Sequence, residues 1–244
     1  MALGALTGFL YVCYSARAKG ISLEIILDLT IWILASSLAG SRLLFVLEHL
    51  PYYLSNPLEI IFSRSGFDFY GGFIISLLTA VSYLIRKVYP VWKFADIIVP
   101  GVALGETISQ IGCFMNGCCY GRPVNPKFVP WAIPFPYLDG ISVDIPLYRH
   151  PTQLYHVVIG LLIFLMLVSL NKRKSFHGET FWTYLIAFSS MQFIIEIFQE
   201  PGQGIFLSYI SLSQVISLII FSFSVGIVFR FKNLSLYHPE NKKD

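Results

Sequence analysis

Long apolar stretches separated by short basic clusters are the feature that most constrains how this chain can fold. Seven such stretches are present, over residues 2–16, 23–47, 70–85, 94–114, 152–170, 180–198 and 205–229. A helix needs about 20 mainly apolar residues to cross the hydrocarbon core of a bilayer, so these stretches predict transmembrane helices. Charged residues make up only 13% of the chain, against about 25% in a soluble domain. The sequence therefore predicts an all-α polytopic membrane protein, with a single transmembrane domain over residues 1–244.

Basic residues between the stretches predict the orientation of the helices. Cytoplasmic loops carry an excess of Lys and Arg, so the positive-inside rule places the N-terminus outside and the C-terminus in the cytoplasm. Six or eight crossings would break this pattern. A signal peptide at residues 2–16 is the alternative, although no basic residue precedes that stretch. With seven crossings, one side of the membrane receives 12 of the 17 basic residues: Arg17, Lys19, Arg86, Lys87, Lys93, Lys172, Arg173, Lys174, Arg230, Lys232, Lys242 and Lys243.

Two loops on the predicted outer side are long enough to hold structure. Residues 49–69 are semi-apolar and contain two prolines, which is typical of a segment that lies at the membrane interface. Residues 117–150 are rich in proline and aromatic residues and predict a small β- or turn-rich outer cap. The basic residues of the inner loops account for the net charge of +3, so no nucleic-acid partner is expected.

The sixth apolar stretch carries a row of polar residues near its outer end. Ser189, Gln192, Glu196 and Gln199 are spaced by three, four and three, which places them on one face of a helix. Hydrogen bonding between helices is the alternative interpretation for the serine and the glutamines. A carboxylate such as that of Glu196 is costly in hydrocarbon, which favours a functional or paired role.

Three other stretches carry polar residues toward the same side. Arg42 lies near the end of the second stretch, where extension of its side chain to the outer interface is the alternative to a site role. Together the four polar faces predict a cavity at the outer leaflet, which suits a substrate with a charged head and acyl tails. The remaining polar residues are Glu106, Gln110 and Cys113 in the fourth stretch, and His150, Gln153 and His156 at the start of the fifth.

Three of the four cysteines lie at the outer end of the fourth stretch, in "SQIGCFMNGCCYGRP". A disulfide from Cys113 to Cys118 or Cys119 is one option on the outer side of the membrane. A zinc site that adds His150 or His156 is another. The spacing matches no closed zinc template, so no metal site is predicted and packing of small side chains is favoured.

Five segments resemble the phosphatidylglycerol–prolipoprotein diacylglyceryl transferase family, in the family's order. They are "AGSRLLFVLEHLPYYLSNPLEII", "GFDFYGGFI", "ALGETISQIGCFMNGCCYGRP", "RHPTQLYH" and "FSSMQFIIEIFQEP". The third resembles the signature Gly-Arg-Ile-Gly-Asn-Phe-x-Asn-Gly-Glu-x-x-Gly. The family's seven spans with an outside N-terminus agree with the orientation predicted from the basic residues.

The resemblance includes departures at polar positions. Gln110 and Gln192 stand where the family has arginine, and Tyr70 stands where it has histidine. Cys113 and Cys118 replace an asparagine and a glutamate of the signature. Residues that match the family are Arg42, Gly112, Asn116, Gly121, Arg122, Arg149, His150, Gln153, Tyr155 and Glu196.

The resemblance implies an enzyme of the bacterial cytoplasmic membrane. It would transfer a diacylglyceryl group from phosphatidylglycerol, or another glycerolipid, to a cysteine thiol of an exported lipoprotein precursor. We expect a monomer without a cofactor. The candidate catalytic residues are Glu196, His150 and Tyr70, and the candidate lipid- or phosphate-binding residues are Arg42, Asn116, Gly121, Arg122, Arg149, Gln110 and Gln192.

The two glutamines also support a different function. A departing phosphate needs cations, and guanidinium suits it because it binds two oxygens at once. By analogy with oxyanion holes, each lost donor costs a factor of about 100 to 1,000 in rate. The alternative is therefore a lipid- or lipopeptide-binding paralogue without the standard activity, or one that acts on a neutral lipid head.

Overall fold

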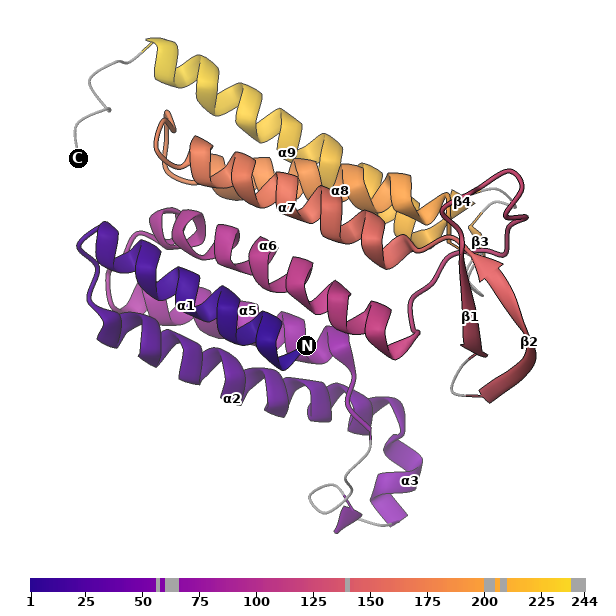
Figure 1. Cartoon of the computed structure of the whole chain (residues 1–244). Coiled ribbons are helices and arrows are strands. Elements are labelled where there is room, and N and C mark those ends of the chain that lie inside the picture. The colour runs from indigo at the N-terminus through magenta and orange to yellow at the C-terminus, as the bar shows by residue number, and fades with distance from the viewer. Residues whose placement is uncertain (56–57, 60–65, 139–140, 200–204, 207–209, 238–244) are drawn as a thin grey trace. The chain divides into compact units, whose positions relative to one another are not determined.

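The computed structural model describes residues 1–55, 58–59, 66–138, 141–199, 205–206 and 210–237 (Figure 1). These residues form eight helices and two small antiparallel hairpins. The helices are α1 (Ala2–Ala18), α2 (Leu23–Glu48), α3 (Leu50–Ser55), α5 (Phe69–Arg86), α6 (Val91–Asn116), α7 (Thr152–Leu170), α8 (Glu179–Glu196) and α9 (Leu212–Tyr237). The strands are β1 (Ile133–Leu138), β2 (Ile141–Arg149), β3 (Ile205–Phe206) and β4 (Ile210–Ser211).

Each apolar stretch contains one helix, and the bounds agree within a few residues for the first six. The seventh stretch differs, because strands β3 and β4 precede α9, which begins at Leu212. A reciprocal cap sets this start. The Ser211 N–H donates to Oε1 of Gln214 at 3.0 Å, and the Gln214 N–H donates to Oγ of Ser211 at 3.1 Å. This Ser-x-x-Gln pattern is a capping box, which satisfies the free N–H groups of a first helical turn.

Within the described part of the chain, four helices are long and apolar enough to cross a membrane by length and composition: Leu23–Glu48, Val91–Asn116, Thr152–Leu170 and Leu212–Asn233. A shorter apolar helix covers Tyr70–Arg86. Within a bilayer, helices satisfy their own backbone hydrogen bonds, which lipid cannot do for them. The chain is therefore a mainly helical, multi-pass membrane protein.

Two compact units make up the chain: residues 1–12 with 95–244, and residues 13–94. In the second unit α2 packs on α5 through glycines. A Cβ added at Gly40 would lie 2.5 Å from the carbonyl oxygen of Gly71 and 2.6 Å from Cβ of Ile75. Such close approach of two backbones is how small residues join helices in lipid. Asp68 caps α5, because its Oδ1 accepts from the N–H of Gly71 at 3.0 Å.

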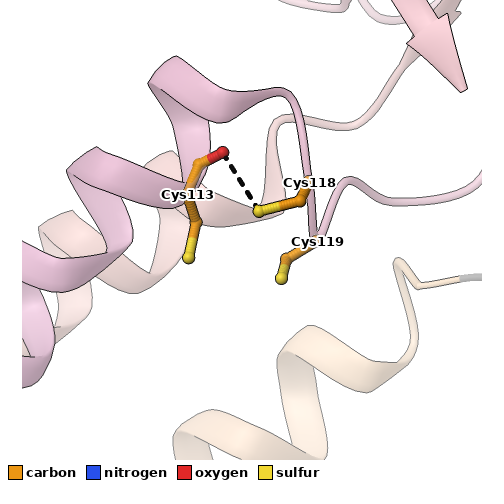
Figure 2. Close-up of side chains that lie close together, drawn as sticks. All are labelled: Cys113, Cys118 and Cys119. Carbon is orange, nitrogen blue, oxygen red and sulfur yellow. Dashed lines mark hydrogen bonds between the residues drawn. The ribbon is translucent and has the colours of Figure 1, made fainter. Parts of the chain in front are cut away.

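In the larger unit, α6 ends in a turn that carries two of the cysteines. Gly117 follows the helix with a φ of +67°, a conformation that costs glycine little. The N–H of Cys118 then donates to the carbonyl of Cys113 at 3.1 Å. The thiol of Cys118 donates to the same oxygen at 3.5 Å (dashed line in Figure 2), so the turn folds back on the last turn of α6. The hairpin of β1 and β2 follows, in the region predicted to form an outer cap.

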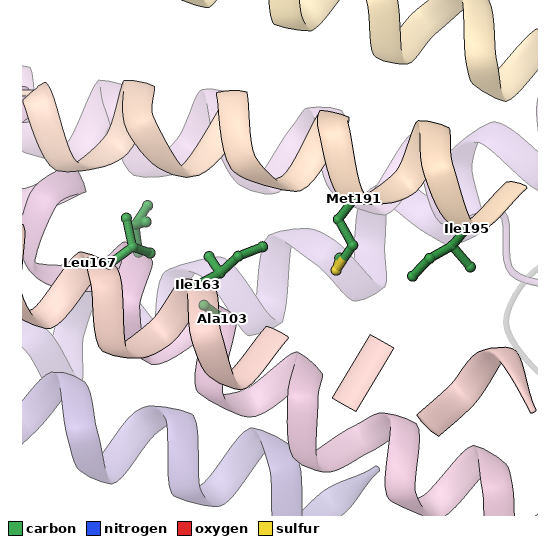
Figure 3. Close-up of a cluster of buried hydrophobic side chains, with 6 residues drawn as sticks. Ala103, Ile163, Leu167, Met191 and Ile195 are labelled. Carbon is green, nitrogen blue, oxygen red and sulfur yellow. The ribbon is translucent and has the colours of Figure 1, made fainter. Parts of the chain in front are cut away.

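Helices α6, α7 and α8 share an apolar core (Figure 3). The buried members are Val99 and Ala103 of α6, Ile163 and Leu167 of α7, and Met191 and Ile195 of α8. Helix α9 packs along α8 (Figure 1). This core fixes the three helices whose polar side chains form the site described below.

A buried carboxylate ties the other end of these helices together. Asp96 of α6 is fully buried, and its Oδ2 accepts from Nζ of Lys174 at 2.6 Å and from the N–H of Gly178 at 2.8 Å. Its Oδ1 accepts from the N–H of Phe181 at 3.0 Å. Gly178 is the N-cap of α8 and has no side chain, so Asp96 satisfies N–H groups at the start of α8 from a neighbouring helix.

We expect Asp96→Ala to destabilise the protein strongly. Removing one partner of a buried ion pair leaves unsatisfied groups and costs about 3 kcal/mol. Denaturant unfolding in detergent micelles, followed by tryptophan fluorescence, measures the loss. The control is Asp28→Ala, because Asp28 is exposed and accepts one hydrogen bond from Tyr83, worth at most about 1 kcal/mol. Equal losses for the two variants would contradict the role given to Asp96.

We also expect Gly40→Ala to destabilise the pair of α2 and α5, whereas Gly226→Ala in α9 is tolerated. The new methyl group at Gly40 meets the backbone of α5, and overpacking of this kind costs about 1–3 kcal/mol. At Gly226 a Cβ meets no described atom within 4 Å, and alanine is the better helix former. Thermal unfolding of both variants in the same detergent makes the comparison, and equal midpoints would rule out tight packing at Gly40.

Candidate active site

A small cavity lies between α6, α7 and α8, and polar side chains surround it. Glu106, Thr107 and Gln110 of α6, His156 of α7 and Tyr184 of α8 line it, together with apolar residues. The cavity has room for about one water molecule. The helices must therefore shift before a lipid head group can enter. Ionisable groups enclosed by apolar helices are costly, and they mark the cavity as the candidate site.

Two hydrogen bonds join the polar groups across helices. Tyr184 donates its hydroxyl to Oε2 of Glu106 at 3.3 Å. Nδ1 of His156 lies 3.0 Å from the carbonyl oxygen of Thr152, and Nε2 lies 3.4 Å from Oε1 of Gln192. Because a carbonyl only accepts, Nδ1 carries a hydrogen. Nε2 faces the side-chain amide of Gln192, which can accept through its oxygen or, with oxygen and nitrogen exchanged, donate through its NH₂.

Gln110 presents an unused acceptor at this cavity. Its Oε1 is buried and has no hydrogen-bond partner among the residues that the structure describes. A buried acceptor left without a donor costs about 1–3 kcal/mol. A hydroxyl group of a ligand, or a water molecule, would remove this cost. Gln110 therefore suits a neutral, hydroxyl-bearing part of a substrate.

An open groove runs between α1 and α6, within the larger unit. Its volume is about 330 Å³, and it is lined mainly by apolar and small residues of the two helices. The helices approach closely at Gly4 and Gly8 of α1 and at Gly101 and Gly105 of α6. Glu106 lines both this groove and the small cavity, so the groove and the cavity adjoin at this residue of α6.

The start of α7 holds in place the turn that follows α6 and carries Cys118 and Cys119, called here the signature turn. Oγ1 of Thr152 donates to the carbonyl of Cys119 at 2.7 Å, and Nε2 of Gln153 donates to the carbonyl of Cys118. Thr152 and Gln153 are fully buried. A Cβ added at Gly121 would lie 2.4 Å from the carbonyl oxygen of Phe198, so only glycine fits there. Gly121 thus has a packing role next to the site.

Arg149 and His150 support this turn and do not line the cavity. The guanidinium of Arg149 donates to the carbonyl of Gly121 at 3.3 Å and lies over the ring of Tyr120, 4.6 Å from its centroid. Nδ1 of His150 lies 3.0 Å from the hydroxyl of Tyr155. Both residues are buried. Sequence reasoning placed them at a substrate site, whereas here they contact neighbouring backbone and aromatic rings.

The other predicted residues lie outside the cavity lining. In the larger unit, Asn116 and Arg122 are exposed and Glu196 is half-buried. In the unit of residues 13–94, Tyr70 is exposed. Arg42 of that unit donates to the carbonyls of Gly66, at 2.9 Å, and Glu59, and its guanidinium lies 5.2 Å from the ring centroid of Tyr53.

Of the predicted site residues, Gln110 lines the cavity. Gln192 contacts His156, which also lines it. The sequence predicts that Glu106 and His156 lie on polar faces of two helices, but it does not single them out as site residues. Tyr184 was missed altogether. Its position four residues before Phe188 and eight before Gln192 places it on the polar face of α8, and that spacing could have identified it.

The fold and this site define a class: multi-pass helical membrane proteins with a polar cavity between their helices. The particular family follows from sequence comparison. The family profile described as "Prolipoprotein diacylglyceryl transferase" matches residues 1–230. The chain belongs to this family.

Relatives from distant bacteria agree with this assignment. The phosphatidylglycerol–prolipoprotein diacylglyceryl transferase of Finegoldia magna is 33% identical over 232 residues, which cover 94% of this chain and 88% of the relative. The proteins of the same name from Dechloromonas aromatica and Enterococcus faecalis are 35% and 33% identical, over 90% and 92% of this chain and 84% and 82% of theirs. The chain thus spans most of the length of each relative.

We expect stability to fall at mildly acidic pH because of His150. Burial lowers the pKa of His150, and the charge of Arg122 lowers it further. The unfolded chain, with a histidine pKa of about 6.5, then binds the proton better than the folded protein. The stability that the folded protein gains by keeping His150 neutral is complete above about pH 6.5. It is lost as the pH falls below that value toward the pKa of His150 in the folded protein.

The measurement is the thermal midpoint in detergent between about pH 7.5 and about pH 5.5. His150→Gln should reduce its dependence on pH. His49→Gln is the control, because His49 is exposed, and it should leave the dependence unchanged. If His150→Gln keeps the wild-type dependence, another group controls stability in this range.

Proposed function

We propose that this protein is a phosphatidylglycerol–prolipoprotein diacylglyceryl transferase. It would move the diacylglyceryl group of phosphatidylglycerol to the thiol of a cysteine in an exported lipoprotein precursor. Family membership over residues 1–230 supports the activity. The observation that carries the assignment to a site is the polar cavity of α6, α7 and α8, which shares Glu106 with an apolar groove. A lipid could place its tail in such a groove and its head at the carboxylate.

The proposed topology has seven spans, with the N-terminus outside and the C-terminus in the cytoplasm. The protein would act as a single transmembrane domain and a monomer in the bacterial cytoplasmic membrane. Helices α1, α2, α5, α6, α7, α8 and α9 would be the spans, and the hairpin of β1 and β2 would belong to an outer cap. The 12 basic residues on one side support this orientation, because cytoplasmic loops retain Lys and Arg.

The proposed reaction is a displacement at carbon. The sulfur of the acceptor cysteine attacks the carbon of the diacylated glycerol that is bonded to the phosphate oxygen. The bond between that carbon and that oxygen breaks. Glycerol phosphate leaves with the electron pair, and the thiol proton passes to a base. Thiolate is the nucleophile, so a base near the reacting sulfur is required.

The residues that line the cavity supply candidates for the base and for the groups that position the substrate. Glu106 and Nε2 of His156 are the candidate proton acceptors, and Tyr184 would hold the carboxylate through its hydrogen bond. Gln110 would accept a hydrogen bond from a glycerol hydroxyl. The predicted roles of Glu196, His150 and Tyr70 in proton transfer remain part of the proposal.

Cations for the phosphate are the other requirement. Arg122 is the best placed of the matching arginines in the larger unit, because it is exposed and its side chain has no hydrogen bond or ion pair among the described residues. Arg42 and Arg149 contact backbone and rings, and each would have to exchange these contacts to meet phosphate. Asn116 and Gly121 would shape the phosphate-binding turn.

The two glutamines at and beside the cavity also favour a second candidate function. Gln110 and Gln192 supply amides where the resemblance places arginines, and amides bind hydroxyl groups without requiring an anion. A paralogue that binds a lipid or lipopeptide, or acts on a neutral lipid head, would have this chemistry. The lipid that copurifies distinguishes the two: phosphatidylglycerol supports the transferase, and a neutral glycolipid supports the alternative.

The deciding experiment combines rescue and transfer. We expect the protein to rescue growth of a bacterium depleted of its own transferase, and to move labelled diacylglyceryl from phosphatidylglycerol vesicles to a lipoprotein-precursor peptide. Glu106→Gln should lower the transfer rate by a factor of about 100 to 10,000, which is typical for loss of a general base. Glu24→Gln is the control, because Glu24 is an exposed glutamate outside the cavity.

A protein that is well expressed and correctly inserted, yet neither rescues growth nor transfers the group, would exclude the transferase. Full activity of Glu106→Gln would instead exclude the proposed role of this carboxylate and leave the transferase assignment intact.

A further inference from the structure

Three thiols meet at the outer end of α6. The Sγ atoms of Cys113, Cys118 and Cys119 all lie within 4.8 Å of one another (Figure 2). Cys113 is buried, Cys118 is half-buried and Cys119 is exposed, so the cluster is covered on the helix side and accessible on the other. All three are free thiols in the structure. They take no part in the cavity lined by Glu106 and His156.

The backbone holds these thiols together before any ligand binds. Cys119 has a φ of +62°, a left-handed conformation that is unfavourable for a residue with a side chain. The buried side chains of Thr152 and Gln153 fix the carbonyls of Cys119 and Cys118 from α7. Backbone strain that is held by buried hydrogen bonds is typical of a preorganised site. Simple packing of three small side chains would not require it.

The spacing of the sulfurs matches the demands of a metal ion. A zinc–sulfur bond is about 2.3 Å long, so three sulfurs on one ion lie about 4 Å apart. The cluster reaches this spacing with small side-chain movements. A disulfide requires about 2.05 Å between two sulfurs and would leave the third without a role. Thiolates also select soft metal ions over Mg²⁺ or Ca²⁺, which prefer oxygen.

We propose that Cys113, Cys118 and Cys119 bind one thiophilic metal ion, Zn²⁺ or Cu⁺. Each thiol loses its proton on binding, and the protons pass to solvent. The spacing of these cysteines along the sequence matches no closed template of four ligands, and for that reason it predicts no metal site. Here no fourth His, Cys, Asp or Glu among the described residues joins the group, so Zn²⁺, which takes four ligands, would keep one coordination position open.

The open coordination position leaves room for a ligand that is not part of this chain. In the proposed function the acceptor is a cysteine thiol, and a metal ion deprotonates a thiol that it coordinates. The ion would then hold the acceptor sulfur as a thiolate at the turn that carries Cys118 and Cys119, as the alternative to removal of its proton by Glu106 or His156 in the cavity. This role rests on the proposed function, whereas the metal site itself does not. The resemblance places asparagine and glutamate at the positions of Cys113 and Cys118, so the site is a departure from the family pattern.

The test measures metal directly on the full-length protein in detergent. The protein is reduced, freed of metal with a chelator and titrated with Zn²⁺ alone or, without oxygen, with Cu⁺ alone. We expect about one ion per chain to survive gel filtration for the ion that the site prefers. Cys113→Ser, Cys118→Ser and Cys119→Ser should each weaken binding by at least about tenfold. Cys13→Ser is the matched control and should leave binding unchanged, because Cys13 lies in α1 and is not part of the group.

A readout on the wild-type protein guards against misfolded variants. Bound metal should slow maleimide labelling of Cys118 and Cys119, located by mass spectrometry, relative to the metal-free protein. Failure of the reduced wild-type protein to retain either ion would overturn the proposal. Binding as tight as that of the wild-type protein in all three serine variants would overturn it as well. So would a disulfide within the cluster in native membranes.

The role of the open position needs a separate measurement. With Co²⁺ in place of Zn²⁺, a lipoprotein-precursor peptide should change the sulfur-to-cobalt absorption, and the same peptide with serine for cysteine should not. An unchanged spectrum with the cysteine peptide would exclude thiol binding but not the metal site. Metal binding without diacylglyceryl transfer would refute the proposed function and leave the site standing.

Discussion

The carboxylate of Asp96 joins three parts of the helical framework around the cavity. It receives Lys174 from the loop between α7 and α8 and two N–H groups from the start of α8, while it belongs to α6. Asp96 is fully buried, so these groups of the protein, and not solvent, satisfy its carboxylate. The apolar core further along the same helices then fixes their register. Glu106, His156 and Tyr184 can face one cavity because this framework holds α6, α7 and α8 in place.

Each of the seven apolar stretches contains a helix, and four helices of the described part of the chain are long and apolar enough to cross a membrane, because a span must present about 20 apolar residues to lipid. The start of α9 was missed because the capping box at Ser211 and Gln214 outweighs the apolar character of the preceding residues. Asp96 was also missed. From sequence alone it is a single acid near a basic loop, and only the fold shows that its partners are backbone groups of another helix.

The site was predicted only in part, for a related reason. Spacing along one helix shows that residues share a face, but not which faces of different helices meet. Glu106 and His156 were recognised as polar faces, yet the resemblance directed attention to Glu196, Arg149 and His150. In the structure Arg149 and His150 hold the turn that carries the cysteines. The close grouping of Cys113, Cys118 and Cys119 depends on the left-handed backbone at Cys119, which no sequence pattern indicated.

The unequal lengths of neighbouring helices have a consequence for the surrounding bilayer. Helix α7 has 19 residues and rises about 28 Å, close to the hydrocarbon thickness of about 30 Å. Helix α6, which shares its core, has 26 residues and rises about 39 Å. Its apolar stretch covers only residues 94–114, which rise about 32 Å and match the hydrocarbon thickness. The extra length of α6 therefore lies at its polar ends, near Lys93 and Asn116, and these ends reach into the head-group region beyond the ends of α7.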